Sequence, residues 1–142
     1  MPTIALASDH AGFAMKATLA DELRAAGHEV IDLGPHDETS VDYPDYGRAL
    51  GEAVAAGRAE RGIAVCGSGI GISIAVNRIA GARCALVTGG LMARLARQHN
   101  DANCIALGSR IIGIDTARDC VAEFLNTPFE GGRHAGRVAK LG

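Results

Sequence analysis

Short apolar runs alternate with amphipathic segments along the chain. The runs are nearly continuous in hydrophobic residues and turn residues follow each of them, which is typical of strands buried on both faces of a parallel sheet. The five predicted strands are Ile4 to Ser8, Glu29 to Leu33, Gly62 to Cys66, Arg83 to Val87 and Cys104 to Gly108.

Helical periodicity appears between these runs, with apolar residues every three or four positions. The segments concerned are 15–26, 44–57, 72–79 and 115–126, and Pro44 and Asp115 suit the first turns of two of them. Alternating strands and helices predict an α/β fold with one five-stranded parallel sheet and helices on both faces, a three-layer sandwich. Residues 1–142 contain no linker, so we expect a single domain.

The composition fits such a domain and excludes several other classes. The apolar runs are far shorter than the 18 or more residues of a membrane span, and the sequence Met-Pro-Thr-Ile at the start lacks the features of a signal peptide. We therefore expect a cytoplasmic protein with no membrane association. Glycine occurs 19 times in 142 residues, which indicates several unusual backbone turns.

The net charge of −2 hides an uneven distribution. Residues 1–60 carry 11 acidic and 4 basic side chains, whereas residues 61–142 carry 5 acidic and 10 basic ones. Twelve of the 14 basic residues are arginines, whose planar guanidinium binds phosphate or carboxylate at two points. With only five aromatic residues there is little support for nucleic acid as the partner, so a small anion is favoured.

In open parallel sheets, ligands bind beyond the carboxyl ends of the strands. Asp9 and His10 follow the first predicted strand, Cys66 ends the third, and Ser109 and Arg110 follow the last. An acidic irregular stretch, residues 34–43, is long enough to be a functional loop. These residues are the candidates for a ligand site.

Residues 66–71, with the sequence Cys-Gly-Ser-Gly-Ile-Gly, lie between a strand and an apolar helical stretch. Glycines at such a turn let several N–H groups point into one anion site at a helix N-terminus. A dinucleotide-binding loop would have its third glycine at position 72, where this chain has Ile72. A cysteine phosphatase loop would have its arginine at the same position. A Walker loop would be followed by a lysine, and none follows here. These three common loops are therefore excluded.

Cys66 lies at the mouth of this loop, where a helix N-terminus favours the thiolate form. The thiolate could act as a nucleophile or as a general base, and the N–H groups could stabilise an oxyanion next to it. The alternative is a small buried hydrophobic residue. Cys84, Cys104 and Cys120 lie in apolar patterns and are expected to pack in the core, and no cysteine or histidine spacing supports a metal site.

A second set of polar residues lies outside the strand ends. His99 could transfer protons near neutral pH, while Asn100 could simply cap a helix. Arg133, His134 and Arg137 share one short segment and would share a face if it is helical, although a solvated basic face is the alternative.

Taken together, these motifs resemble the type B ribose-5-phosphate isomerase family, which includes allose- and galactose-6-phosphate isomerases. The resemblance covers nearly the whole chain in the same order. The residues that carry it are 8–12, 42–44, 66–71, 99–103, 108–110 and 132–137. It implies a Rossmann-like domain that pairs as a homodimer or tetramer, with each active site completed by the neighbouring chain and with no cofactor.

The resemblance also implies roles for individual residues. Cys66 would move a proton between C1 and C2 of the sugar phosphate through an enediolate, and His99 would open the furanose ring. The loop residues Gly67, Ser68, Gly69, Ile70 and Gly71 would hold the oxyanion. The phosphate would be bound by His10, Arg110, Arg133 and Arg137. The sugar would be contacted by Asp9, Tyr43 and Asn100.

The leading hypothesis is therefore interconversion of ribose 5-phosphate and ribulose 5-phosphate. One alternative keeps the chemistry on allose 6-phosphate, galactose 6-phosphate or erythrulose 4-phosphate, and another is a sugar-phosphate sensor without catalysis. A response-regulator domain is disfavoured because the chain has Cys66 where that fold needs an aspartate after the third strand.

Overall fold

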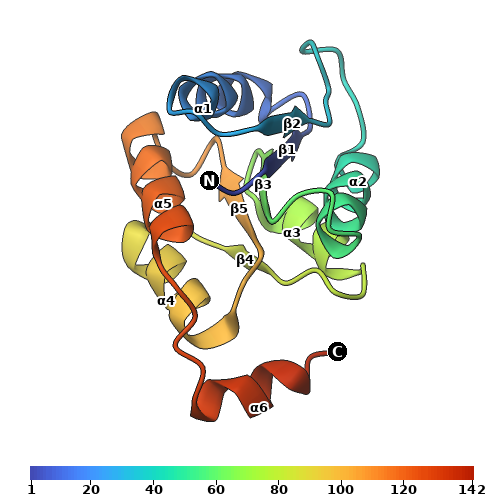
Figure 1. The fold of residues 1–142 in the computed structure, drawn as a ribbon. Helices are drawn as coiled ribbons and strands as arrows, with labels where there is room; N and C mark the ends of the chain where they lie inside the picture. The colour runs from blue at the N-terminus through green and yellow to red at the C-terminus, as the bar shows by residue number, and fades with distance from the viewer.

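Five strands form one parallel sheet in the order β2-β1-β3-β5-β4 in a computed structural model that describes residues 1–142 (Figure 1). The strands are β1 (Ile4–Ser8), β2 (Val30–Asp32), β3 (Arg61–Cys66), β4 (Cys84–Leu86) and β5 (Cys104–Gly108). Every neighbouring pair is parallel, which confirms the sheet predicted from the apolar runs.

Helices cover both faces of this sheet. They are α1 (Phe13–Ala25), α2 (Tyr43–Ala55), α3 (Ile70–Asn77), α4 (Gly90–Asn100), α5 (Ile114–Asn126) and α6 (Arg133–Ala139). Helices α1, α4 and α5 pack on one face, α2 and α3 pack on the other, and α6 lies beyond the end of α4 (Figure 1). The predicted three-layer sandwich is confirmed, and none of the six helices combines the length and hydropathy needed to cross a bilayer.

The two faces of the sheet bury side chains of different size, because successive strand residues point to opposite faces. The face under α1, α4 and α5 carries large residues, namely Ile4, Leu6, Ile63, Val65, Ile105 and Leu107. The face under α2 and α3 carries small ones, namely Ala5, Ala7, Ala64, Cys66, Cys104 and Ala106. Helices α2 and α3 therefore approach the sheet closely, and Cys66 lies on this side.

The edge strands are shorter than the sequence predicts. Strands β2 and β4 have three residues each, against the predicted 29–33 and 83–87. Short edge strands limit the row of unpaired backbone groups that could pair with another chain. Beside β4, the Asn77 side chain donates to the carbonyl of Cys84 at 2.9 Å and accepts from its N–H at 2.7 Å.

Lys16 on α1 is completely buried. Its Nζ donates to Asp32 Oδ1 at 2.7 Å and to the Pro35 carbonyl at 2.6 Å. A buried ammonium needs such partners, because leaving one unpaired in the interior costs several kcal/mol. Lys16 thereby joins α1 to the end of β2 and to the start of the loop 33–42, which leads into α2 and its first residue, Tyr43.

We predict that Lys16→Met lowers the free energy of unfolding by about 3 kcal/mol, since it leaves the Asp32 carboxylate without its cation. The only other lysine, Lys140, is exposed, so Lys140→Met is the matched control and should change stability by less than about 0.5 kcal/mol. Urea unfolding of both variants measures the difference. Equal stability of the two variants would contradict a structural role for Lys16.

Candidate functional site

Strands β1, β3 and β5 end side by side, with Ser8 opposite Val65 and Cys66 opposite Gly108. The loops that follow them enclose a cavity of about 330 Å³ at this carboxyl edge. Its lining consists of Asp9, Tyr43, Cys66, Gly67, Ser68, Gly71, Arg110 and Ile111. All but Ile111 were predicted from the sequence, so the fold brings seven of the candidate residues together.

The Cys66 side chain is 5% exposed, and its Sγ accepts a hydrogen bond from the Gly69 N–H at 3.1 Å. The hydroxyl of Ser68 accepts from the Ile70 N–H at 3.1 Å, at the start of α3. N–H groups in the first turn of a helix have no partners within the helix and carry partial positive charge. The cavity beside the sulfur therefore lies at a helix N-terminus, which suits a negatively charged ligand.

This turn depends on glycine at two positions. Gly69 has a φ of +80°, and a Cβ there would lie 2.7 Å from Leu86 Cδ1 and 3.0 Å from the Leu107 carbonyl carbon. A Cβ on Gly71 would lie 2.7 Å from the ring of Tyr43. The chain can thus pass tightly from β3 into α3 beside β5, and the Tyr43 ring can lie directly on the helix.

Two further predicted residues, Asp9 and Arg110, line the cavity with the thiol, and His10 follows Asp9 in the chain. Arg110 donates its backbone N–H to the Gly67 carbonyl at 2.9 Å, which holds the β5 loop against the glycine loop. Asp9 Oδ1 accepts from the Gly12 N–H at 3.0 Å. His10 Nδ1 accepts from the Val41 N–H at 3.2 Å, so the proton of its neutral ring is on Nε2. The predicted acidic stretch 34–43 thus contacts His10 through Val41 and contributes Tyr43 to the lining of the cavity.

The other predicted residues lie elsewhere. His99, Asn100 and Arg137 line a separate cavity of about 250 Å³ together with His134. His99 and Asn100 end α4, immediately before β5 begins, and therefore lie at the amino edge of the sheet. Cys66 is level with Gly108 at the far end of β5, about 13 Å along a strand that rises about 3.3 Å per residue.

One chain therefore does not bring His99 and Cys66 into the same cavity. Arg133 begins α6 and is exposed, and it lines neither of these two cavities. The structure thus divides the predicted residues into a carboxyl-edge group around Cys66 and an amino-edge group around His99.

The amino-edge group contains a residue that the sequence did not suggest. Glu130 Oε1 lies 3.6 Å from His99 Nε2, and the rings of His99 and His134 stack with centroids 4.5 Å apart. Glu130 comes from an irregular segment, and its only sequence signal is that it is an acidic residue beside a basic cluster. Its proximity to His99 depends on tertiary packing.

Donor atoms of His99, Glu130 and His134 lie within 4.8 Å of one another, as metal ligands can. The two imidazole planes, however, are only 13° from parallel and are stacked. An ion in the plane of one ring lies out of the plane of the other, whereas imidazole binds metals in its own plane. In this arrangement, the three side chains are better suited to transferring protons and balancing charge than to coordinating one metal ion together.

The three other cysteines pack in the core or beside it, as predicted. Burial raises the pKa of Cys104 to about 12 and the pKa of Cys84 well above its usual value. Burial and the nearby Asp119 also raise the pKa of Cys120. These thiols stay protonated near neutral pH, so none of the three is a candidate base.

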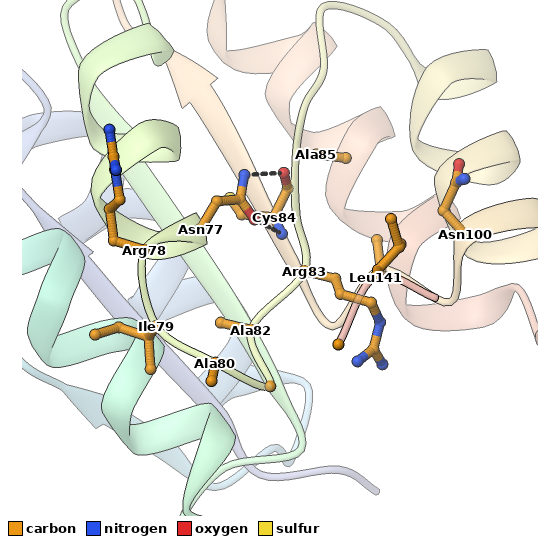
Figure 2. A pocket seen from close by; sticks show the side chains of 13 residues that line it. Asn77, Arg78, Ile79, Ala80, Ala82, Arg83, Cys84, Ala85, Asn100 and Leu141 are labelled. Atoms are coloured by element: carbon orange, nitrogen blue, oxygen red, sulfur yellow. Dashed lines mark hydrogen bonds between the residues drawn. The ribbon is translucent and has the colours of Figure 1, made fainter. Parts of the chain in front are cut away.

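A larger cavity of about 550 Å³ lies between the α3–β4 connection and the end of the chain (Figure 2). Asn77, Cys84, Asn100 and Leu141 are among its lining residues. Figure 2 shows Asn100 and Leu141 on one side of it and the hydrogen-bonded Asn77 and Cys84 on the other. It contains no base comparable to Cys66, so the carboxyl-edge cavity is the candidate active site.

Known proteins resemble this chain over nearly its whole length. A model of the family described as Ribose/Galactose Isomerase matches residues 4–141. Ribose-5-phosphate isomerase B of Escherichia coli K12 is 44% identical over 99% of this chain and 95% of its own length. The Clostridium thermocellum ribose-5-phosphate isomerase B structure is 51% identical, with a TM-score of 0.97 and coverage of 99% and 95% of the two chains.

A third comparison concerns a structure with a ligand. Ribose-5-phosphate isomerase B of Mycoplasma genitalium, solved with bound ribulose-5-phosphate, is 37% identical to this chain with a TM-score of 0.94. The match covers 98% of this chain and 93% of that one.

We predict that Gly69→Ala destabilises the fold more than Gly57→Ala. Both residues have positive φ, +80° and +78°, but a Cβ on Gly57 meets nothing within 4 Å. Gly57→Ala should therefore cost only the left-handed backbone penalty of about 1–2 kcal/mol. Gly69→Ala should cost at least about 1 kcal/mol more, because the β3–α3 turn must move away from β5. Urea unfolding measures both, and equal losses would contradict the close packing of this turn.

Proposed function

The chain belongs to the ribose/galactose isomerase family, and on this premise we propose how its residues interconvert ribose 5-phosphate and ribulose 5-phosphate. The reaction moves a proton from C2 of the open-chain aldose to C1, and the proton of the C2 hydroxyl to the former carbonyl oxygen. Its intermediate is an enediolate. Such a reaction needs a base next to a group that stabilises an oxyanion.

Cys66 is the base in this mechanism. The observation that carries the proposal is the position of its Sγ, which faces the Gly69 N–H at 3.1 Å inside the carboxyl-edge cavity. The thiolate takes the proton from C2 and returns it to C1. Backbone N–H groups of residues 67–71 and the Ser68 hydroxyl hold the oxyanion that forms meanwhile, and Ile70 contributes through its backbone.

The sugar phosphate extends from this base along the cavity. Asp9 and Tyr43 contact its hydroxyl groups, and Tyr43 lies against α3 at Gly71. His10 and Arg110 of the same chain bind the phosphate. Nε2 of His10 is free to donate because Nδ1 is already an acceptor, and a guanidinium binds phosphate at two points.

The residues of the amino edge act in a second chain. His99 opens the furanose ring and Asn100 orients the substrate, while Arg133 and Arg137 add to the phosphate site. Because these residues lie too far from Cys66 in one chain, we propose a homodimer in which each site takes its amino-edge group from the partner. A tetramer made of two such dimers meets the same requirement.

Exposed apolar side chains support this dimer. Ile70 and Ile74 of α3 and Leu91, Met92 and Leu95 of α4 are between 37% and 58% exposed. Helix α4 begins with Gly90 at the carboxyl edge of the sheet, and its penultimate residue, His99, lies at the amino edge, about 14 Å away at 1.5 Å per residue. If two chains pack along α4 about a twofold axis, the end of α4 in one chain lies beside the start of α4 in the other. The amino-edge group of each chain is then brought toward the carboxyl edge of its partner.

We also propose a cytoplasmic location. The mechanism needs Cys66 as a free thiol, and all four cysteines of the chain are free. A reducing compartment keeps thiols in that state. Export of the active protein to an oxidising compartment would contradict this location.

A second class of substrate, a six-carbon sugar phosphate, is also a candidate, because the family description names galactose as well as ribose. Measuring kcat/KM for ribose 5-phosphate, allose 6-phosphate and galactose 6-phosphate decides between them, since discrimination between substrates lies in that ratio. A higher value for a six-carbon sugar would replace ribose 5-phosphate as the substrate. Binding of each sugar without turnover would instead indicate a sensor.

We predict that Cys66→Ala lowers kcat by about 10³-fold or more, because general base catalysis is lost, with a smaller change in KM. Deuterium uptake at C1 of ribulose 5-phosphate in heavy water should fall equally. Cys84→Ala is the control, since that thiol is protonated and outside the site. A folded Cys66→Ala variant that isomerises at the wild-type rate would falsify the mechanism.

We further predict that Cys66→Ala and His99→Ala chains complement each other. Each variant alone should be nearly inactive. After the chains are mixed and reassociated, half of the dimers are hybrids with one intact site, so activity should return to about a quarter of the wild-type value. Continued inactivity of well-mixed hybrids would show that one chain supplies both residues to each site.

A further inference from the structure

The segment between α5 and α6 is held against the end of α4 by contacts with the two residues that precede His99. Arg97, which is buried, donates from Nε to the Thr127 carbonyl at 3.1 Å. The Glu130 N–H donates to the Gln98 carbonyl at 3.1 Å. These contacts fix the backbone of Glu130 beside the residue that precedes His99.

A sharp turn then returns the chain toward His99. Gly131 and Gly132 have positive φ values of +69° and +56°, a conformation that other residues adopt at a cost. Helix α6 starts directly afterwards, and its second residue is His134. The turn therefore allows Glu130 and His134 to meet His99 from two sides.

Glu130 contributes charge. The charged or titratable groups that face His99 are Glu130 from the segment before α6, and His134, Arg137 and the nearby Arg133 from α6. Glu130 is the only carboxylate among them, with Oε1 3.6 Å from His99 Nε2. It offsets the two arginines and stabilises a positive charge on the His99 ring.

His134 contributes a fixed surface. It is 6% exposed, and its Nε2 has no hydrogen-bond partner. Burial, with Arg133 and His99 next in importance, lowers the pKa of His134, so the ring is neutral near neutral pH. A neutral ring stacked on His99 restricts its rotation without repelling a proton that His99 carries.

We propose that Glu130 and His134 are positioning residues for ring opening, which they serve by fixing the orientation and the charge of His99. The inference rests on the proposed function. In ring opening the C1–O4 bond breaks, the ring oxygen O4 gains a proton and the C1 hydroxyl loses one. His99 gives the first proton and takes the second, so it alternates between imidazolium and imidazole, and Glu130 stabilises the imidazolium.

Only one direction of the reaction begins with ring opening. Ribose 5-phosphate is mostly a furanose, which must open before Cys66 can act. Ribulose 5-phosphate stays open-chain, because its C5 oxygen carries the phosphate and cannot close a five-membered ring onto C2. Exchange of the C1 proton of ribulose 5-phosphate with solvent therefore requires Cys66 but not His99.

This difference gives the test. We expect Glu130→Gln to lower kcat for ribose 5-phosphate about tenfold or more, a part of what general acid–base catalysis supplies. Deuterium uptake at C1 of ribulose 5-phosphate in heavy water should stay within about twofold of the wild type.

Three further variants separate charge from packing. Glu52→Gln, on the exposed side of α2, is the matched control and should change neither readout. Glu130→Asp should recover part of the ribose activity. His134→Phe keeps a flat ring and loses no hydrogen bond, so it should retain more ribose activity than His134→Ala.

Two results would overturn the inference. One is full ribose activity in Glu130→Gln, and the other is an equal loss of ribose turnover and of C1 exchange, which a purely structural role would give. Failure of the proposed function can be told apart from failure of this inference. In that case the wild-type chain would show no isomerisation, or Cys66→Ala would retain it.

Discussion

The site depends on one turn, in which the Gly69 N–H reaches back to Cys66 Sγ. The bond requires a left-handed backbone at Gly69 and no Cβ there, since β5 lies directly behind it. Because the turn is so tight, α3 starts within a few residues of the thiol and its first N–H groups lie close to it. The proposed base and the proposed oxyanion site thus depend on the same few backbone angles, and α3 packs on the face that has small side chains.

Much of this arrangement could be predicted from the sequence, because its determinants are local. Apolar runs and helical periodicity gave the three layers, and the glycines around Ser68 indicated the anion site next to Cys66. The short edge strands were not predictable, since hydrophobicity does not show where a strand loses its neighbour. The position of Glu130 beside His99 depends on Arg97 binding the Thr127 carbonyl, a contact across 30 residues with no local signal.

The separation of the two groups follows from the topology of any strand–helix–strand unit. A crossover helix runs against its strands, so residues at its end lie at the edge of the sheet opposite to the strand ends. His99 lies in the last turn of α4 and Cys66 ends β3, and no side-chain rotation can span the length of β5 between them. A motif-based prediction names both residues and says nothing about the distance between them.

The unequal faces of the sheet affect how freely the sequence can change. Under α1, α4 and α5 the strands present isoleucine, leucine and valine, which can exchange for one another while the total volume is kept. Under α2 and α3 they present alanine and cysteine, so an added methyl group pushes on the helix that begins at the thiol. Substitutions that raise or lower thermal stability are therefore tolerated more easily on one side of the sheet, and the geometry around Cys66 is insulated from them.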